Sequence, residues 1–223
     1  MRSAKIISTL LCISMSVSLT GCFGGSRLSP DKLVSYAEDK EAEVYDSARK
    51  FSSFLDDIKS DAVSANVEDG AVIRLEGKDI KTVLSKKSIC ILPIIDNFYD
   101  DDMTEAAVYC TGKIKSDDDG HIEYVYSVVF EDEEDAEDYF DDIHEGIQPK
   151  ASNKSAKNDE GEEEGISYSV MTIVDNDNSA GVGVYRDGKT VMLIVAYGYN
   201  NTKGLDIVDG ICEDFDLHLI SDV

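Results

Sequence analysis

The stretch that decides the fold lies at residues 180–199, which read AGVGVYRDGKTVMLIVAYGY. Within it, Asp187-Gly188 is typical of a two-residue type I′ turn between antiparallel strands. Residues 191–196 form the most apolar run outside the first 22 residues, as expected for a strand that is covered on both faces. The stretch therefore predicts a hairpin whose second strand, 190–199, lies in the centre of an antiparallel sheet.

Working outward, two pairs of predicted strands are each followed directly by a helix. Strands 106–114 and 122–130 precede a helix that Asp132 can cap and that Gly146 closes. The hairpin of 180–199, itself preceded by a strand at 167–174, leads into a final helix. The apolar residues of that helix recur at helical spacing: Leu205, Val208, Ile211, Cys212 and Phe215. This recurrence favours a duplicated β-β-α unit.

The region before residue 106 contains a long amphipathic pattern. Ser29-Pro30-Asp31 is a helix start, with Ser as the N-cap and Pro at the first helical position. Apolar residues then recur at spacings of three, four and seven, which predicts one amphipathic helix, or two in line, up to about residue 60. Residues 71–75 read as a short strand and 79–84 as a turn of helix. The apolar run 88–95 is interrupted by Pro93, which places it at a sheet edge or outside the sheet.

These elements predict an α+β fold, in which an antiparallel sheet carries helices mainly on one face and the long N-terminal helix covers the rest. A single acidic domain spans residues 30–223, because each strand pair alone has too few strands to bury its apolar face. Residues 147–165 are rich in Lys, Glu, Ser and Asn and offer nothing larger than Ala to a core. We expect them to form a mobile loop.

The first 22 residues carry a distinct motif. Arg2 and Lys5 precede an apolar run at 6–18 that is too short to span a bilayer, and the run ends in Leu19-Thr20-Gly21-Cys22. This arrangement resembles the signal peptide and lipobox of bacterial lipoproteins. The resemblance implies that residues 1–21 are removed and that Cys22 receives a diacylglyceryl thioether. Residues 22–29 would then be a lipidated cysteine and a flexible tether, and the domain would be anchored to the cell membrane on its extracytoplasmic side.

Five cysteines limit the covalent chemistry of the chain. Cys12 leaves with the leader and Cys22 carries the lipid, so Cys90, Cys110 and Cys212 remain and at most one disulfide forms within a monomer. A bridge between Cys90 and Cys110 is compatible with the exported location, but the sequence leaves it open. Cys212 lies on the apolar face of the last helix, where we expect a buried thiol.

The balance of charge excludes some classes of partner. The chain has 46 acidic and 21 basic residues and a formal net charge of −25. Nucleic-acid binding needs a basic footprint, so we expect no nucleic-acid partner. Attraction to anionic headgroups is also excluded, so the membrane contact would depend on the lipid anchor.

A search for catalytic motifs finds none. The sequence has no Gly-x-Ser-x-Gly nucleophile elbow, no P-loop and no zinc-protease motif, and it implies no cofactor. His121, His144 and His218 are far apart in sequence, and we expect each to be an exposed polar residue. We therefore predict no catalytic residue.

Two weaker patterns indicate binding sites. Asp175, Asp177 and Ser179 place oxygen ligands at alternate positions, as at the start of a calcium loop, although Gly181 and Arg186 depart from the EF-hand pattern. A plain turn is the alternative.

Tyr197, Tyr199 and Asn200 form an aromatic and amide cluster at the end of the central strand, where a ligand could stack. Packing on a sheet face is the alternative reading. The sequence as a whole predicts a non-catalytic binding or interaction module of the cell envelope, with an unknown protein or small-molecule partner. The alternatives are a carboxylate- or metal-dependent envelope enzyme and a calcium-stabilised module.

Overall fold

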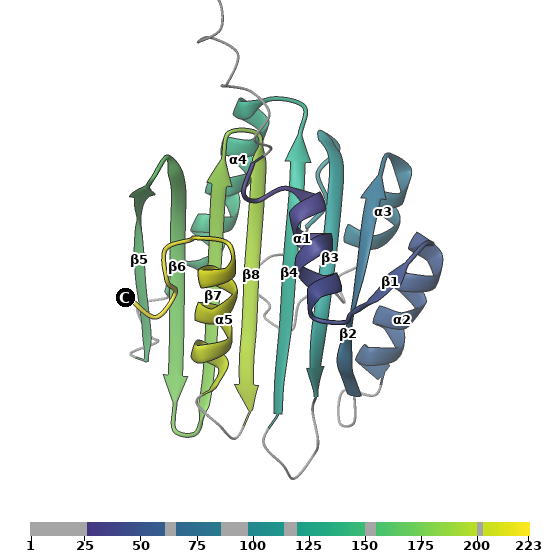
Figure 1. Cartoon of the computed structure of the whole chain (residues 1–223). Helices are drawn as coiled ribbons and strands as arrows, with labels where there is room; N and C mark the ends of the chain where they lie inside the picture. Colours follow the sequence, from purple (N-terminus) through teal and green to yellow (C-terminus); the bar gives the residue numbers. More distant parts are fainter. Residues whose placement is uncertain (1–25, 61–65, 86–97, 114–119, 150–154, 200–202) are drawn as a thin grey trace, which may run out of the picture.

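An eight-stranded sheet forms the middle layer of the molecule, with helices packed on both of its faces (Figure 1). The structure is a computed structural model that describes residues 26–60, 66–85, 98–113, 120–149, 155–199 and 203–223. The strand order is β1-β2-β3-β4-β8-β7-β6-β5. β1 is parallel to β2, and every other neighbouring pair is antiparallel. The prediction of a mixed fold built on an antiparallel sheet is thus confirmed.

The strands are β1 (Glu43–Tyr45), β2 (Asn66–Glu76), β3 (Met103–Lys113), β4 (Gly120–Phe130), β5 (Ala156–Glu163), β6 (Ile166–Asp175), β7 (Asn178–Asp187) and β8 (Thr190–Tyr199). The helices are α1 (Pro30–Asp39), α2 (Ala48–Ser60), α3 (Lys78–Leu84), α4 (Glu133–Ile147) and α5 (Lys203–Asp214). The short strand and helix turn expected at 71–75 and 79–84 lie within β2 and α3. The apolar run 88–95 lies outside the described residues.

The hairpin of β7 and β8 occupies the centre of the sheet as predicted, but its turn is shifted by one residue. Asp187 pairs with Thr190, so Gly188 and Lys189 are the two central residues. Gly188 has φ +56°, whereas Lys189 does not have the positive φ that a type I′ turn requires. Glycine at the first central position is instead the arrangement of a type II′ turn.

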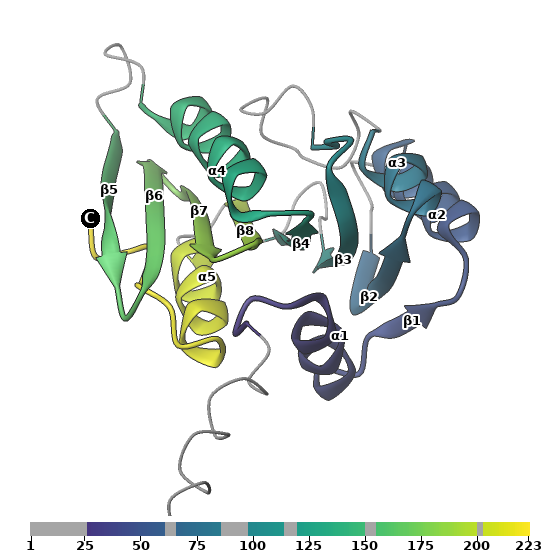
Figure 2. The ribbon, with the colours of Figure 1, turned by 90° about the horizontal axis from the view of Figure 1, so that it is seen from above.

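Helices cover both faces of the sheet, which corrects the expectation that they lie mainly on one (Figure 2). We call the side covered by α2, α3 and α4 the α4 face, and the side covered by α1 and α5 the α5 face. The reason lies in the central strand, because Leu193 of β8 belongs to the core under the α4 face and Ile194 to the core under the α5 face. A strand that is apolar on both sides needs cover on both sides.

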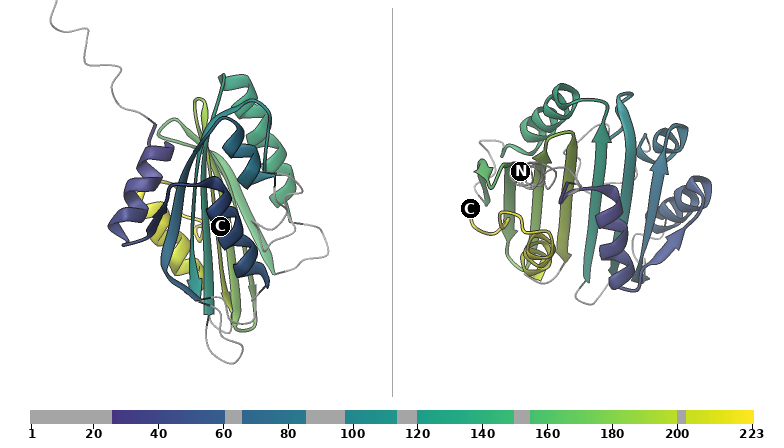
Figure 3. Two further views of the ribbon diagram at one scale, coloured as in Figure 1. Left: turned by 90° about the vertical axis from the view of Figure 1, so that its right-hand side faces the viewer. Right: turned by 45° about the horizontal axis from the view of Figure 1, so that its top comes forward.

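The amphipathic pattern of residues 30–60 is divided between two helices, α1 and α2, which lie on opposite faces of the sheet (Figure 3). The prediction of one helix, or of two helices in line, is therefore wrong. α1 ends because Glu41 adopts φ +64° and the Ala42 amide donates to the Ala37 carbonyl at 2.9 Å. This is the hydrogen bond of a Schellman-type helix end. The chain then forms β1 at the edge of the sheet and enters α2 on the other face.

The folded part begins before residue 30, which shortens the expected tether of residues 22–29. Leu28 is fully buried in the core under the α5 face. The buried hydroxyl of Ser127 on β4 donates a hydrogen bond to the Leu28 carbonyl. Residues 26–29 therefore belong to the domain.

The region 147–165 is not simply a mobile loop, because it contains the edge strand β5. Its backbone pairs with β6 along its whole length, from Ala156 opposite Ile173 to Glu163 opposite Ile166. The pairing needs only main-chain groups, so the polar sequence gave no hydrophobic pattern to detect. Acidic side chains on such an edge also protect it against pairing with another chain.

The predicted cap of α4 is confirmed, whereas the duplicated β-β-α unit is not shown. The Asp132 carboxylate accepts from the Glu134 amide at 3.0 Å and from the Asp135 amide at 3.1 Å. α4 follows β4, and α5 follows β8, but the two helices lie on opposite faces. β4 and β8 are antiparallel neighbours in one sheet, and a rotation that superposes one on the other leaves each face of the sheet on its own side. If the two β-β-α units were copies, α4 and α5 would therefore lie on the same face.

Candidate functional site

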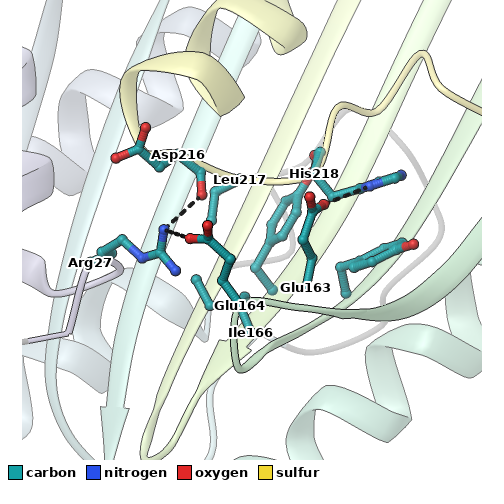
Figure 4. Close-up of a pocket in the computed structure, with 9 residues that line it drawn as sticks. Arg27, Glu163, Glu164, Ile166, Asp216, Leu217 and His218 are labelled. Atoms are coloured by element: carbon teal, nitrogen blue, oxygen red, sulfur yellow. Dashed lines mark hydrogen bonds and ion pairs between the residues drawn. The ribbon is translucent and has the colours of Figure 1, made fainter.

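A pocket of about 390 Å³ opens on the α5 face, between the β5–β6 turn and the segment that follows α5 (Figure 4). We call it the Arg27 pocket. Its lining combines charged, aromatic and apolar side chains: Arg27, Glu163, Glu164, Ile166, Tyr168, Tyr185, Asp216, Leu217 and His218. These residues come from both ends of the described chain and from three strands.

Two tight reversals of the backbone shape this pocket. Glu164 (φ +51°) and Gly165 (φ +83°) lie between the paired residues Glu163 and Ile166, which is a two-residue turn of type I′. On the other side, Asp216 adopts φ +53° after α5, and the Leu217 amide donates to the Cys212 carbonyl at 2.9 Å. This second reversal directs the chain back over the sheet and places His218 beside β6.

Arg27 joins the two sides of the pocket. Its Nη1 donates to Glu164 Oε2 at 3.0 Å and to the Asp216 carbonyl at 3.2 Å. The Glu164 side chain is 74% exposed. Because such a solvent-exposed ion pair contributes little free energy, Glu164 can leave the guanidinium and pair with a cationic ligand without a large penalty.

His218 forms the aromatic wall of the pocket. Its ring stacks on the Tyr168 ring with centroids 4.0 Å apart and planes 9° apart. Its Nδ1 lies 3.2 Å from Glu163 Oε2, and its Nε2 lies 3.6 Å from Asp159 Oδ2. The Tyr185 hydroxyl donates to the His218 carbonyl at 2.8 Å. His218 is only 18% exposed, so the expectation of an exposed polar residue is wrong at this position.

The charge around the pocket favours a cationic group. Glu163, Glu164 and Asp216 supply three carboxylates, while Arg27 supplies the one permanent positive charge. A small polar ligand with an amino or guanidino group can pair with these carboxylates, and the Tyr168–His218 stack offers it a flat aromatic surface.

A second hollow, of about 350 Å³, lies on the other side of Arg27 between α1 and α5. Lys40 crosses it, with Nζ 3.1 Å from Asp214 Oδ2 and 5.1 Å from the centroid of the Tyr36 ring. Two of its charged side chains, Lys40 and Asp214, are thus paired across the groove.

One group of side chains on the α4 face resembles a catalytic triad. Ser169 Oγ lies 2.9 Å from His144 Nδ1, and His144 Nε2 lies 3.3 Å from Glu160 Oε2. However, Ser169 is fully buried beneath α4 and lines neither of the two pockets described above. A nucleophile must reach its substrate, so the arrangement serves packing. It also shows that His144 is partly buried, contrary to expectation.

Glu123 is a buried carboxyl group on the α5 face of β4. Only 9% of the residue is exposed, and burial raises the pKa of Glu123 to about 7. Its neighbour His121, with Nε2 3.5 Å from Glu123 Oε1, has a lowered pKa because of burial and the nearby Lys203. Both shifts favour neutral forms, so near pH 7 much of this pair is uncharged.

The predicted calcium ligands do not converge. Asp175 and Asp177 lie in the β6–β7 hairpin, whereas Ser179 is buried and its Oγ accepts a hydrogen bond from the Gly204 amide at 3.0 Å. That contact ties the beginning of α5 to β7. Within the described ranges, no group of three or more His, Cys, Asp or Glu side chains is placed to hold a metal ion.

The predicted aromatic cluster is described only in part. Tyr197 is half-buried on β8, where it pairs with Ile122 and Ala180 on the neighbouring strands. Tyr199 ends β8, but its side chain is not described, and Asn200 lies outside the described residues. The proposed stacking role therefore stays a prediction.

Of the cysteines, Cys22 and Cys90 lie outside the described residues. Cys110 and Cys212 carry free, buried thiols. Cys110 belongs to the core under the α4 face and Cys212 to the core under the α5 face, so these two are separated by the sheet. The burial of Cys212 is confirmed. The possible bridge between Cys90 and Cys110 involves a residue outside the described part of the chain, so it stays open.

Sequence reasoning missed the Arg27 pocket. Arg27 lay in the supposed tether, and His218 follows the last predicted helix without any motif around it. Only the two backbone reversals bring these residues together, and the sequence signal for the first, Glu164-Gly165, is weak.

Comparisons with known proteins identify no characterised family for the folded domain. No protein-family model matches the chain, and no curated protein matches it. Among the described residues, no helix is both long enough and apolar enough to cross a membrane. A solved structure, the extracellular domain of PknH from Mycobacterium tuberculosis, matches with a TM-score of 0.40 and 12% sequence identity over 74% of this chain and 88% of that chain.

Proposed function

We propose that this protein is an exported, lipid-anchored protein of the bacterial cell envelope whose domain binds a small polar ligand. The observation that carries the anchoring is the lipobox Leu19-Thr20-Gly21-Cys22, preceded by a charged and an apolar segment of signal-peptide length. The folded domain starts soon afterwards, with Leu28 already buried. The chain between anchor and fold is therefore very short.

This short connection supports a location of the Arg27 pocket close to the bilayer. Arg27 follows Cys22 by five residues, and five residues span at most about 18 Å. An acyl chain on Cys22 would hold the backbone of Arg27 within that distance of the anchor. A ligand at the membrane surface would then meet the pocket first.

The geometry supports binding rather than catalysis. Ser169, His144 and Glu160 have triad-like distances in the described part of the chain, but the group is closed to substrate because Ser169 is fully buried. The Arg27 pocket is open and polar, and its carboxylates match an amine-bearing ligand. We therefore propose a non-catalytic binding role.

The anchoring is tested with Cys22→Ala in cells that express the full chain. We expect this variant to leave the membrane fraction, whereas Cys12→Ala, which changes a cysteine within the leader, behaves as the wild type. If Cys22→Ala stays in the membrane fraction at its unprocessed mass, the thioether anchor is the wrong explanation. If Cys22→Ala reaches the same membrane fraction at the same processed protein mass and with the same acyl label as the wild type, the thioether anchor is excluded.

The binding role is tested with spermidine, a flexible polyamine, as the probe. We expect spermidine to raise the melting temperature of the full chain in detergent, and the double variant Glu163→Gln, Glu164→Gln to lose most of that shift. Glu145→Gln with Asp141→Gln, on the exposed side of α4, is the matched control. Equal shifts in all three proteins would mean that the acidic surface attracts the polyamine everywhere and that the pocket has no special role.

A further inference from the structure

Arg27 uses only part of its hydrogen-bonding capacity within the described part of the chain. A guanidinium carries five N–H donors on three nitrogens. Among the described residues only Nη1 has acceptors, which are Glu164 Oε2 at 3.0 Å and the Asp216 carbonyl at 3.2 Å (Figure 4). The edge formed by Nε and Nη2 therefore remains for a ligand, and such an edge binds a carboxylate through two parallel hydrogen bonds.

Glu164, the partner of Arg27, likewise keeps one oxygen for a ligand. Its Oε2 accepts from Arg27, while its Oε1 forms no hydrogen bond or ion pair with a described residue. The residue lies in the β5–β6 turn, and its side chain is 74% exposed. An ammonium group of a ligand can thus reach Oε1 while the ion pair with Arg27 stays in place.

The direct contact between these two charges decides which ligands they attract. Arg27 Nη1 and Glu164 Oε2 are 3.0 Å apart, so a ligand that carries only a positive charge is attracted by Glu164 and repelled by Arg27 at a similar distance. A ligand that carries only a negative charge meets the opposite balance. A ligand that carries an ammonium and a carboxylate side by side pairs with both residues at once.

The rest of the pocket lining suits an apolar or aromatic group on such a ligand. Ile166 and Leu217 bring aliphatic side chains to the pocket, and Tyr168 brings an aromatic one. The volume of about 390 Å³ lies in the lower part of the range found for small-molecule sites. A ligand of amino-acid size therefore fits beside the ion pair.

We propose that the Arg27 pocket binds an α-amino acid with an apolar or aromatic side chain, whose carboxylate lies on the Nε–Nη2 edge of Arg27 and whose ammonium lies on Glu164. Both charged groups of an α-amino acid are attached to one carbon atom, which suits the direct contact between Arg27 and Glu164. Amino-acid binding rests on the binding role proposed above and adds an anionic group to the amine of that ligand. It does not depend on the lipid anchor.

Titration calorimetry of the full chain in detergent tests this ligand class with three probes of similar shape. At about pH 7 racemic phenylalanine carries both charges, phenethylamine carries only the ammonium, and 3-phenylpropionate carries only the carboxylate. A hydrogen bond to a charged group contributes a factor of about ten or more to affinity. We therefore expect phenylalanine to bind at least about tenfold more tightly than either analogue.

Two variants should separate the roles of the two charges. Arg27→Gln should weaken phenylalanine binding about tenfold but leave phenethylamine binding unchanged or tighter, because the repulsion of the ammonium is removed. Glu164→Gln should weaken phenylalanine binding to a similar extent but leave 3-phenylpropionate binding unchanged or tighter. Lys50→Gln and Glu145→Gln make the same changes of charge at exposed positions of α2 and α4 and should bind all three probes as the wild type does.

The outcomes distinguish the amino-acid ligand from the more general binding role. If phenylalanine binds no more tightly than phenethylamine while spermidine still raises the melting temperature through Glu163 and Glu164, the amino-acid ligand is excluded and the binding role stands. If neither probe depends on these glutamates, both fail. Equal phenylalanine affinity in Arg27→Gln and the wild type would also overturn the proposal. Should Arg27→Gln fail to fold, the comparison of the three probes in the wild type and in Glu164→Gln decides.

Discussion

Replacing the buried Glu123 by glutamine should change the stability of the domain in a pH-dependent way. The carboxyl group lies on β4 under the α5 face, 9% exposed, with His121 3.5 Å away. Burial raises its pKa because the charged form loses hydration. Glutamine has nearly the same shape but cannot ionise, so the comparison isolates the cost of the charge.

The magnitude follows from linkage between ionisation and folding. The pKa of Glu123 rises from 4.5 to about 7 on folding, which corresponds to roughly 3 kcal/mol at about 1.4 kcal/mol per pKa unit. Because the folded-state pKa is raised, the stabilising effect of the neutral carboxyl is fully present below about pH 4.5. This stabilising effect is lost as the pH rises through about 7. At higher pH the ionised carboxylate lowers the free energy of unfolding by a constant amount.

Urea unfolding at pH 4.5 and pH 8.5 measures this effect. The free energy of unfolding of Glu123→Gln, relative to wild type, should increase by roughly 3 kcal/mol between the two pH values. Glu145→Gln, at an exposed position of α4, should show a much smaller change. Parallel pH profiles of Glu123→Gln and wild type would refute the reasoning, since they would mean that Glu123 titrates alike in the folded and unfolded chains.

Three further predictions concern the scaffold. Asp132→Ala removes the cap of α4 and should lower the free energy of unfolding in urea by about 1 kcal/mol. Gly204→Ala should lower the melting temperature by several degrees, because a Cβ would lie 2.6 Å from a backbone nitrogen, whereas Gly210→Ala on the same helix has open space and should be neutral or stabilising. Cys110 and Cys212, whose thiol pKa values burial raises to about 12, should react with a maleimide only after unfolding, as read by peptide mapping.

The parts of the fold that local sequence determines were predictable. β8 has the expected bounds, 190–199, because a long apolar run with a glycine turn before it is a local signal. Asp132 caps α4 for the same kind of reason, since the side chain and the amides that it accepts from are neighbours in sequence. The division of 30–60 into two helices was not visible, because Glu41 carries the positive φ at a position where glycine is the usual signal.

The long-range arrangement and the candidate site were not predictable in this way. β4 pairs with β8 although Phe130 and Thr190 are 60 residues apart in sequence, and that pairing decides which helix covers which face. β5 joins the sheet through backbone hydrogen bonds, which leave no hydrophobic period. Arg27 and His218 become neighbours only through this arrangement, so no spacing in the sequence pointed to their pocket.

The most direct test of a lipid-anchored envelope protein is the mass of the N-terminal peptide isolated from the membrane fraction. We predict a peptide that begins at Cys22 and carries the mass of a diacylglyceryl thioether, with none of residues 1–21 attached. A peptide with an unmodified Cys22, or one that still contains the leader, would contradict the account.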